Sequence, residues 1–317
     1  MPFSLAILFF GVTQRFAMMN SRFAPEYILL KVLLGISFLV AGVSLAFSLD
    51  SAPHSAINQE LPNEYGRVVY QKNQDAKNQI FIIGQSHRSG VNGKNGQDTV
   101  QAQMEIYRIG EWLIRQKNVE LLLPEGFFQN GIVQNSGQGR SYANDAPDSL
   151  DSDHLRSLLQ DTRRFVSADT LLSSHYPIRL GQVEDEELYQ VVSYLVRKLG
   201  NRNEDVNQAF IEELNDYQRK RTAIMLQNIP FAVETEYQRG DMENKHAIFT
   251  IGMAHIADII EILHDKSIKG AGIDDLLLSP AFDLLEESYG VTVILPRSLA
   301  EDGRALRLSR LEQLASP

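Results

Sequence analysis

Two short stretches of this chain share one pattern and constrain its fold more than any other feature. Residues 80–87 and 247–255 each consist of an apolar run, then Gly, two further residues and His. The apolar runs predict buried strands, and the Gly marks where the backbone leaves the sheet. His87 and His255 are therefore expected in turns just beyond two strand carboxyl ends. Open α/β sheets bind their ligands at that edge.

The rest of the folded part alternates between strand and helix patterns, which predicts an α/β fold. The strand at 119–123 follows the first motif after one helix, so a right-handed crossover and a parallel pair are expected. That pairing places Glu125 at the same edge of the sheet as His87. Strands are predicted at 67–70, 80–84, 119–123, 178–183, 247–251 and 291–295, and helices at 98–117, 151–172, 186–199, 204–228 and 254–265.

Some helix ends and connections have sequence signals of their own. Asp98 and Thr99 are expected to cap the helix that follows them. Pro230 is expected to stop the helix that begins near residue 204. The polar stretch at 129–150 predicts a long loop, and the charged tail after Pro296 is expected to be loosely held.

Composition narrows the classes of function. The chain of 317 residues has a formal net charge of −10, which argues against a nucleic-acid-binding surface. It contains no cysteine, so any metal ligands must be His, Asp or Glu. It also lacks the Gly-x-Ser-x-Gly elbow, the His-Glu-x-x-His helix and the phosphate loop. The commonest serine hydrolases, one large metalloprotease class and the P-loop enzymes are thereby excluded.

The amino-terminal segment, residues 1–50, differs from the rest and predicts targeting. Basic residues such as Arg15 and Arg22 precede an uncharged apolar run at 32–49. This pattern predicts a cleaved signal peptide or a single N-terminal membrane anchor, with the amino end in the cytoplasm. The folded part is then exported, either periplasmic or extracellular, or anchored as an extracytoplasmic domain. A linker is expected at 51–64, followed by one α/β domain at 65–317.

Several ionisable residues stand where chemistry is expected. Imidazole serves both as a metal ligand and as a general base near neutral pH, so a matched pair of His residues points to function. Glu125, just beyond a buried strand, suits a metal ligand or a base. Glu184 and Asp185 also follow a strand, but they open a helix and favour its positive end. Arg221 lies on a long helix, where it either pairs with an acid or steadies negative charge on a substrate.

These residues together resemble the TraB/GumN/TIKI superfamily, which also includes ChaN-like and erythromycin-esterase-like proteins. Gly84–His87 and Gly252–His255 resemble its two Gly-x-x-His motifs, and Leu123–Gly126 resembles its glutamate segment. Arg221–Met225 resembles its helical Arg-x-x-x-Met segment, and Gly181–Asp185 the acid-bearing strand end of some branches. The resemblance implies a mixed central sheet flanked by helices, with both His residues at one end. TIKI members are described as proteases that use manganese or cobalt, whereas other members bind haem or hydrolyse a macrolide ester without metal.

The sequence therefore predicts an exported, divalent-metal-dependent hydrolase of the protease or esterase type, using manganese, cobalt or zinc. One alternative is a metal-free esterase-like enzyme in which a His is the base. Another is a protein that binds haem or a small ligand without catalysis. Expected partners are a small-molecule or peptide substrate and a membrane through the N-terminal segment, with no nucleic acid. The predicted metal ligands are His87, His255, Glu125 and Glu184, and the predicted catalytic residues are Glu125 and Arg221.

Overall fold

The two strands that precede the Gly-x-x-His motifs lie side by side at the centre of the sheet. They are β2 (Asn78–Gln85) and β5 (His246–Gly252), which run parallel with Gln85 opposite Gly252. Residues 80–85 and 247–252 are all buried, because helices cover both faces of the sheet. The computed structural model of the chain describes residues 60–86, 96–129, 149–161, 166–200, 208–240, 242–265 and 288–311.

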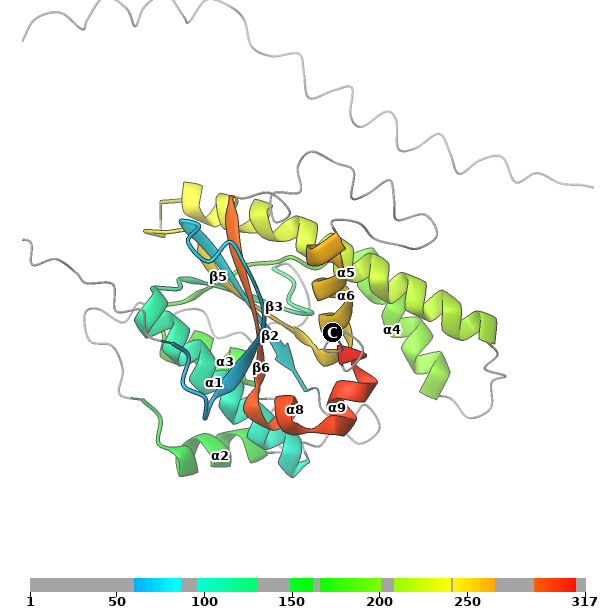
Figure 1. The fold of residues 1–317 in the computed structure, drawn as a ribbon, viewed down its shortest axis with the longest axis horizontal. Coiled ribbons are helices and arrows are strands. Elements are labelled where there is room, and N and C mark those ends of the chain that lie inside the picture. The colour runs from blue at the N-terminus through cyan, green and yellow to red at the C-terminus, as the bar shows by residue number, and fades with distance from the viewer. Residues whose placement is uncertain are drawn as a thin grey trace, which may run out of the picture. The chain divides into compact units, whose positions relative to one another are not determined.

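Within the described residues, the sheet has six strands in the order β1-β6-β2-β5-β3-β4 (Figure 1). β6 (Tyr289–Pro296) pairs with β2, while β3 (Leu121–Pro124) and the short β4 (Arg179–Leu180) extend the sheet from β5, all in parallel. Among these strands only β1 (Gly66–Lys72) is antiparallel, to β6. The mixed sheet confirms the predicted α/β fold class.

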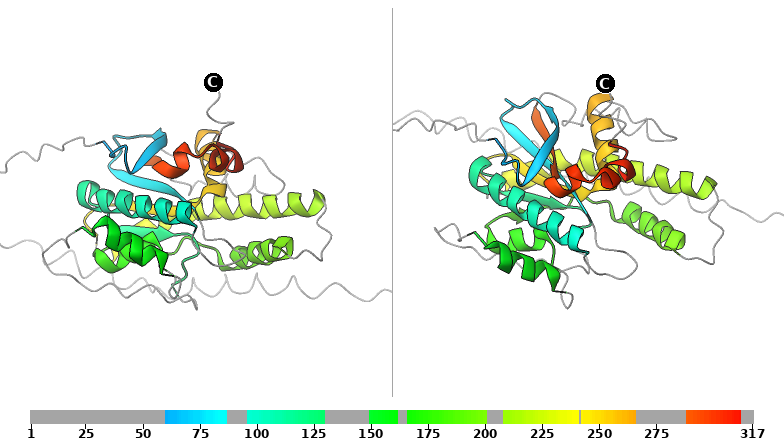
Figure 2. Two further views of the ribbon diagram at one scale, coloured as in Figure 1. Left: turned by 90° about the horizontal axis from the view of Figure 1, so that it is seen from below. Right: turned by 60° about the horizontal axis from the view of Figure 1, so that its bottom comes forward.

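Helices cover the two faces of this sheet (Figure 1). One face packs on α1 (Gln97–Lys117), α2 (Ser152–Gln160) and α3 (Ala168–His175), and the other packs on α5 (Gln208–Gln238) and α6 (Ile256–Asp265). α4 (Glu186–Gly200) lies beside α5, as both views of Figure 2 show, and packs on it through a small apolar cluster. The face under α5 is the one that carries the candidate site.

The predicted direct pairing of β2 with β3 is wrong, because β5 lies between them. β5 is buried along almost its whole length, so its backbone groups need a strand partner on each side. Pro124 at the end of β3 lies opposite Thr250 in β5. The strands are nevertheless parallel, so the carboxyl ends of β2, β5 and β3 still share one edge.

The prediction that Pro230 stops its helix is also wrong, since α5 continues to Gln238. Pro230 lacks an N–H group and removes one backbone hydrogen bond from the helix. Its neighbours Ile229 and Val233 are fully buried in the core beneath α5. Burial of this apolar face on both sides of Pro230 outweighs the loss of one hydrogen bond.

Three further predictions need correction, and they concern a helix cap, one helix and the carboxyl-terminal tail. No side chain caps α1, which begins after Gly96, so Asp98 and Thr99 are not its caps. The helix predicted at 151–172 is two helices, α2 and α3. The tail predicted to be loosely held after Pro296 instead forms α8 (Arg297–Glu301) and α9 (Gly303–Leu308) in its described part, residues 297–311. Its Ser298 donates hydrogen bonds from N and Oγ to Glu105 Oε2 at 2.8 and 2.6 Å, and this contact ties the tail to α1.

All described residues belong to one compact unit, Asn58–Pro317. The targeting segment predicted at 1–50 and most of the linker predicted at 51–64 lie outside the described residues, as does most of the loop predicted at 129–150. In the part of the chain that the structure describes, no helix has both the length and the apolar character needed to span a bilayer.

Candidate active site

Three of the predicted site residues stand at the carboxyl ends of neighbouring strands. His255 ends η2 (Met253–His255), the short 3-10 helix that follows β5 directly. Glu125 is the first residue after β3, and Glu184 follows the short strand β4 within the same connection. The order β5-β3-β4 in the sheet therefore lines up one imidazole and two carboxylates along one edge.

Arg221, from α5, contacts both carboxylates. Its Nε and Nη2 donate to Oε1 and Oε2 of Glu184 at 2.7 and 2.6 Å, and Nη2 also lies 2.9 Å from Glu125 Oε1. Burial opposes the charge of Arg221, but the bonds to Glu184 and the charge of Glu125 outweigh it and raise its pKa. The Tyr189 ring lies 5.2 Å from the guanidinium carbon. Arg221 thus stays charged and directs its donors at the protein's own acids.

Glu125 links the ends of two strands. Its backbone N–H donates to the carbonyl of Thr250 at 2.9 Å, and its Oε2 accepts from the N–H of Gly252 at 2.6 Å. Its Oε1 contacts Arg221 and lies 3.6 Å from Nε2 of His255. The carboxylate is therefore fixed by the backbone on one side and by a cation on the other, with an imidazole beside it.

His255 is held from α5 as well. The residue is 5% exposed, and its Nδ1 lies 2.6 Å from Oγ1 of Thr222. Thr222 is the residue directly after Arg221 in α5 and is fully buried. Two consecutive residues of one helix therefore contact Glu125 and His255, and the position of α5 over the sheet decides the geometry of the pair.

Gly84 of the first motif lets the site pack closely. A Cβ atom added at Gly84 would lie 2.8 Å from Leu295 Cδ2 and 2.9 Å from Met253 Sδ. Both separations are shorter than an ordinary carbon contact, so only glycine fits here without displacing a neighbour. Because Met253 begins η2, the close approach at Gly84 helps to set where His255 lies.

The backbone of Ser86, directly after β2, is held by a residue that the sequence does not single out. The carbonyl of Ser86 accepts a hydrogen bond from Gln103 Nε2 at 3.2 Å. Gln103, in α1, also accepts one from the backbone N–H of Ala168 at 2.8 Å. His87, the next residue along the chain, lies outside the described residues.

Glu184 and Asp185 have separate roles. The Glu184 side chain has no exposed surface, and its Oε2 also accepts from the N–H of Gly126 at 3.0 Å, where φ is 75°. Both Glu184 oxygens are engaged, so binding a metal would require Glu184 to give up these bonds, and that role stays a prediction. Asp185 Oδ1 accepts from the N–H of Leu188 at 2.9 Å and caps α4, which agrees with its predicted place at the start of a helix.

The donor atoms beside His255 suit a divalent cation. His255 Nε2 and Glu125 Oε1 are the nitrogen and oxygen donors that manganese, cobalt and zinc accept. Within the described residues, two carboxylates, those of Glu125 and Glu184, contact the single guanidinium of Arg221 beside this imidazole. The described residues contain no group of three His, Asp or Glu arranged to hold a metal ion, and the predicted ligand His87 is not among them.

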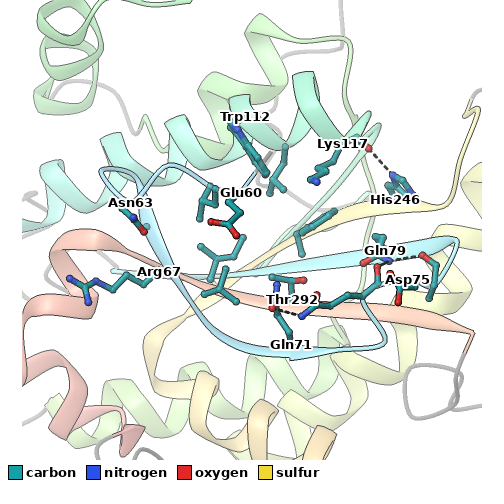
Figure 3. A pocket seen from close by; sticks show the side chains of 18 of the residues that line it. Glu60, Asn63, Arg67, Gln71, Asp75, Gln79, Trp112, Lys117, His246 and Thr292 are labelled. Atoms are coloured by element: carbon teal, nitrogen blue, oxygen red, sulfur yellow. Dashed lines mark hydrogen bonds between the residues drawn. The ribbon is translucent and has the colours of Figure 1, made fainter. Parts of the chain in front are cut away.

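A separate cavity of about 860 Å3 lies near the amino ends of β2 and β5 (Figure 3). Gln79, Trp112, Lys117 and His246 are among its lining residues. The two ring nitrogens of His246 lie 2.7 and 3.0 Å from the carbonyl oxygens of Lys117 and Lys77, which gives this His a structural role. None of the predicted site residues lines this cavity.

The chain matches no protein-family model, no curated protein and no solved structure. The resemblance to the TraB/GumN/TIKI superfamily therefore stays a prediction, and the function has to be argued from the site. Thr222 and Tyr189 belong to that site without having been predicted. The only signal for Thr222 is its place directly after Arg221, as a polar residue in a stretch of the helix that is otherwise largely apolar.

Proposed function

We propose that this chain is an exported, divalent-metal-dependent hydrolase of the protease or esterase type. One observation carries the proposal: His255 Nε2 and Glu125 Oε1 face each other at 3.6 Å at the ligand-binding edge of a parallel sheet. A separation of 3.6 Å is too long for a direct hydrogen bond. It suits two ligands of one ion, since each metal–ligand bond is about 2 Å long.

The surrounding charges support a cation at this point. Within the described residues, the carboxylates of Glu125 and Glu184 share the single guanidinium of Arg221, and this ratio of charges favours a cation beside His255. His255 and Glu125 would hold the ion, with His87 as the predicted third ligand. Bound there, a divalent ion lowers the pKa of a water molecule and polarises a substrate carbonyl.

The protein's own groups then have defined tasks. Arg221 and the N–H of Gly252 hold the Glu125 carboxylate in one orientation, which reduces its freedom before substrate arrives. Glu125 Oε1, on the side facing the imidazole, is the atom that would hold the ion, so the catalytic task we assign to Glu125 is to place that ion beside a substrate carbonyl. The predicted action of Arg221 on a substrate charge would need one of its donors to leave a carboxylate, so we assign it first to positioning Glu125.

The substrate proposed is a small molecule or a peptide with a hydrolysable carbonyl. The net charge of −10 disfavours an anionic polymer, and nucleic acid is not proposed as a partner. The segment at 1–50, outside the described residues, would deliver the domain across the membrane. It would also anchor the domain there unless a signal peptidase removes it.

A metal-free hydrolase is the second candidate, because Glu125 lies close enough to His255 to favour the charged form of its ring. In that case His255 takes the proton from water and Glu125 stabilises the imidazolium. The two candidates differ in one respect that is easily measured: strong chelation abolishes activity only if the first is right. A chromophore absorbance band with no turnover would instead indicate the haem-binding or ligand-binding alternative.

The test is metal analysis of the purified full-length chain after incubation with Mn²⁺ and removal of free ion. We expect about one equivalent of metal per chain for a single site. His255→Ala and Glu125→Gln should lose it, and the control Glu187→Gln, an exposed acid in α4, should keep it. The proposal would be overturned if the chain bound no stoichiometric metal and still hydrolysed a set of ester and peptide substrates after chelation.

A further inference from the structure

The hydroxyl of Thr222 lies between two acceptor-capable groups. Its Oγ1 is 2.8 Å from the carbonyl oxygen of Gln218, one helical turn earlier, and 2.6 Å from Nδ1 of His255. Thr222 is fully buried, so water does not compete for either contact. Threonine hydroxyls in helices commonly donate to the carbonyl four residues earlier in this way.

The hydrogen count of these contacts fixes the direction of each bond. A carbonyl oxygen carries no hydrogen, so the contact with Gln218 requires the hydroxyl to donate its only hydrogen there. The same oxygen can then only accept from His255, which means that Nδ1 carries the proton. We infer that Thr222 is a positioning residue that holds His255 as its Nδ1–H tautomer and leaves Nε2 as the lone-pair atom.

Among the described residues, Glu125 is a potential partner for the opposite tautomer. A proton on Nε2 would face Glu125 Oε1, but these atoms are 3.6 Å apart, beyond a good hydrogen bond. The Thr222 contact at 2.6 Å is a full angstrom shorter. The shorter bond determines the tautomer, and it turns the lone pair of Nε2 toward the carboxylate that we propose as its fellow metal ligand.

With this assignment, two consecutive residues of α5 hold the two donor groups of the proposed metal site. Arg221 fixes Glu125 and Thr222 fixes His255, so one helical turn sets both donors of the proposed metal site. Metal-binding His residues generally donate their other ring N–H to a neighbouring group, and loss of that group weakens metal binding about 10- to 100-fold. The consequence for metal affinity rests on the proposed function, whereas the tautomer itself does not.

The experiment uses the metal-free full-length chain labelled with ¹⁵N-histidine, in which the ring nitrogens of His255 are assigned by comparison with His255→Gln. Wild type and Thr222→Ser should show a protonated Nδ1, because both keep the hydroxyl. Thr222→Val removes the acceptor and should shift the proton to Nε2, the nitrogen on the side of Glu125. Protonated Nε2 in the neutral ring of wild type would overturn the inference, and this result does not depend on any variant at Thr222.

Thr250→Val is a matched control for the loss of a buried hydroxyl. Thr250 is also fully buried, and within the described residues its Oγ1 has no hydrogen-bond partner. This variant should leave the His255 tautomer unchanged. A proton that stays on Nδ1 in Thr222→Val, or a shift equally large in Thr250→Val, would show that Thr222 does not position the ring.

Titration with Mn²⁺ distinguishes a failure of the proposed metal-dependent function from a failure of the positioning role of Thr222. Thr222→Val should bind about 10- to 100-fold more weakly than wild type, and Thr222→Ser should restore most of the affinity. If wild type binds no Mn²⁺ but has a protonated Nδ1 that moves in Thr222→Val, the metal-dependent function fails and the positioning role stands. If wild type binds Mn²⁺ and Thr222→Val binds it equally well, the function stands and the positioning role fails.

Discussion

Arg221 and Glu184 form a buried ion pair with two hydrogen bonds, 2.7 Å from Nε to Oε1 and 2.6 Å from Nη2 to Oε2. The Glu184 side chain has no exposed surface and that of Arg221 is 5% exposed. The pair joins α5 to the segment after β4. Two charges this deeply buried are stable only together, because either one alone would stay in a poorly solvated site.

Arg221→Met should therefore destabilise the protein by about 3–5 kcal/mol, the usual cost of removing one partner from a buried pair. Urea denaturation of the full chain measures the change. The control is Arg67→Met, which breaks a pair with Glu301 whose side chains are 59% and 43% exposed. That loss should be much smaller, because solvent screens an exposed pair. The double variant Arg221→Met/Glu184→Leu should recover part of the loss. Equal losses of stability in Arg221→Met and Arg67→Met would contradict the role of burial.

A second acid, Glu111 in α1, makes stability depend on pH. Burial raises its pKa, but hydrogen bonds from Tyr176, Arg108 and Ser149 outweigh burial and hold the pKa of Glu111 below its ordinary value. A carboxyl with a lowered folded-state pKa stabilises the protein above its unfolded pKa of about 4.3. That contribution is lost as the pH falls through the lower, folded pKa.

Tyr176→Phe should consequently cost about 1.5–3 kcal/mol near pH 7, the value of a hydrogen bond to a charged group. The difference from wild type should shrink as the pH falls below about 4, because Glu111 becomes protonated in both proteins. Denaturation curves measured across this range test both parts. Tyr194→Phe, at a side chain 59% exposed on α4, should show neither effect. A loss that stays constant with pH would mean that Tyr176 acts through packing alone.

Removal of metal should lower thermal stability if the proposed site is right. An ion that binds only the folded chain adds about 2.7 kcal/mol when its concentration is 100 times Kd. Chelation should therefore lower Tm, and added Mn²⁺ should restore it in wild type and in Glu187→Gln. His255→Ala should give the same Tm with and without Mn²⁺, and a full restoration in that variant would place the ion elsewhere.

The strand ends that carry the site could be predicted from the sequence because each follows a compact apolar run. Ile80–Ile83 and Ala247–Ile251 are buried in the structure, and Glu125 and His255 stand beyond their strands as expected. The neighbour of each strand could not be predicted in the same way. The place of β5 between β2 and β3 depends on contacts between distant parts of the chain, for which no local pattern exists.

The roles of individual polar residues were harder to predict than their places. Arg221 and Glu184 were each identified, but only the structure shows that they bind each other. Thr222 contacts His255 because α5 crosses the sheet at one position, and nothing in the local sequence indicates that position. Pro230 shows the converse, since a strong local signal for a helix end is overridden by burial of the residues around it.

The last prediction concerns Gly84, whose place in the motif is explained by packing. In Gly84→Ala the new methyl group would lie 2.8 Å from Leu295 Cδ2 and 2.9 Å from Met253 Sδ. Overpacking of this kind costs about 1–3 kcal/mol, because both side chains have to move. Since Met253 begins the 3-10 helix that ends at His255, Mn²⁺ affinity should fall together with stability.

Gly96→Ala is the matched control, because a Cβ atom at Gly96 would meet nothing within 4 Å. Gly96 is the N-cap of α1, where alanine is less favourable than glycine, so a loss below about 1 kcal/mol is expected with Mn²⁺ affinity unchanged. Urea denaturation and Mn²⁺ titration of both variants separate the effects. If Gly84→Ala lost stability but bound Mn²⁺ as tightly as wild type, Gly84 would support the sheet without setting the position of His255.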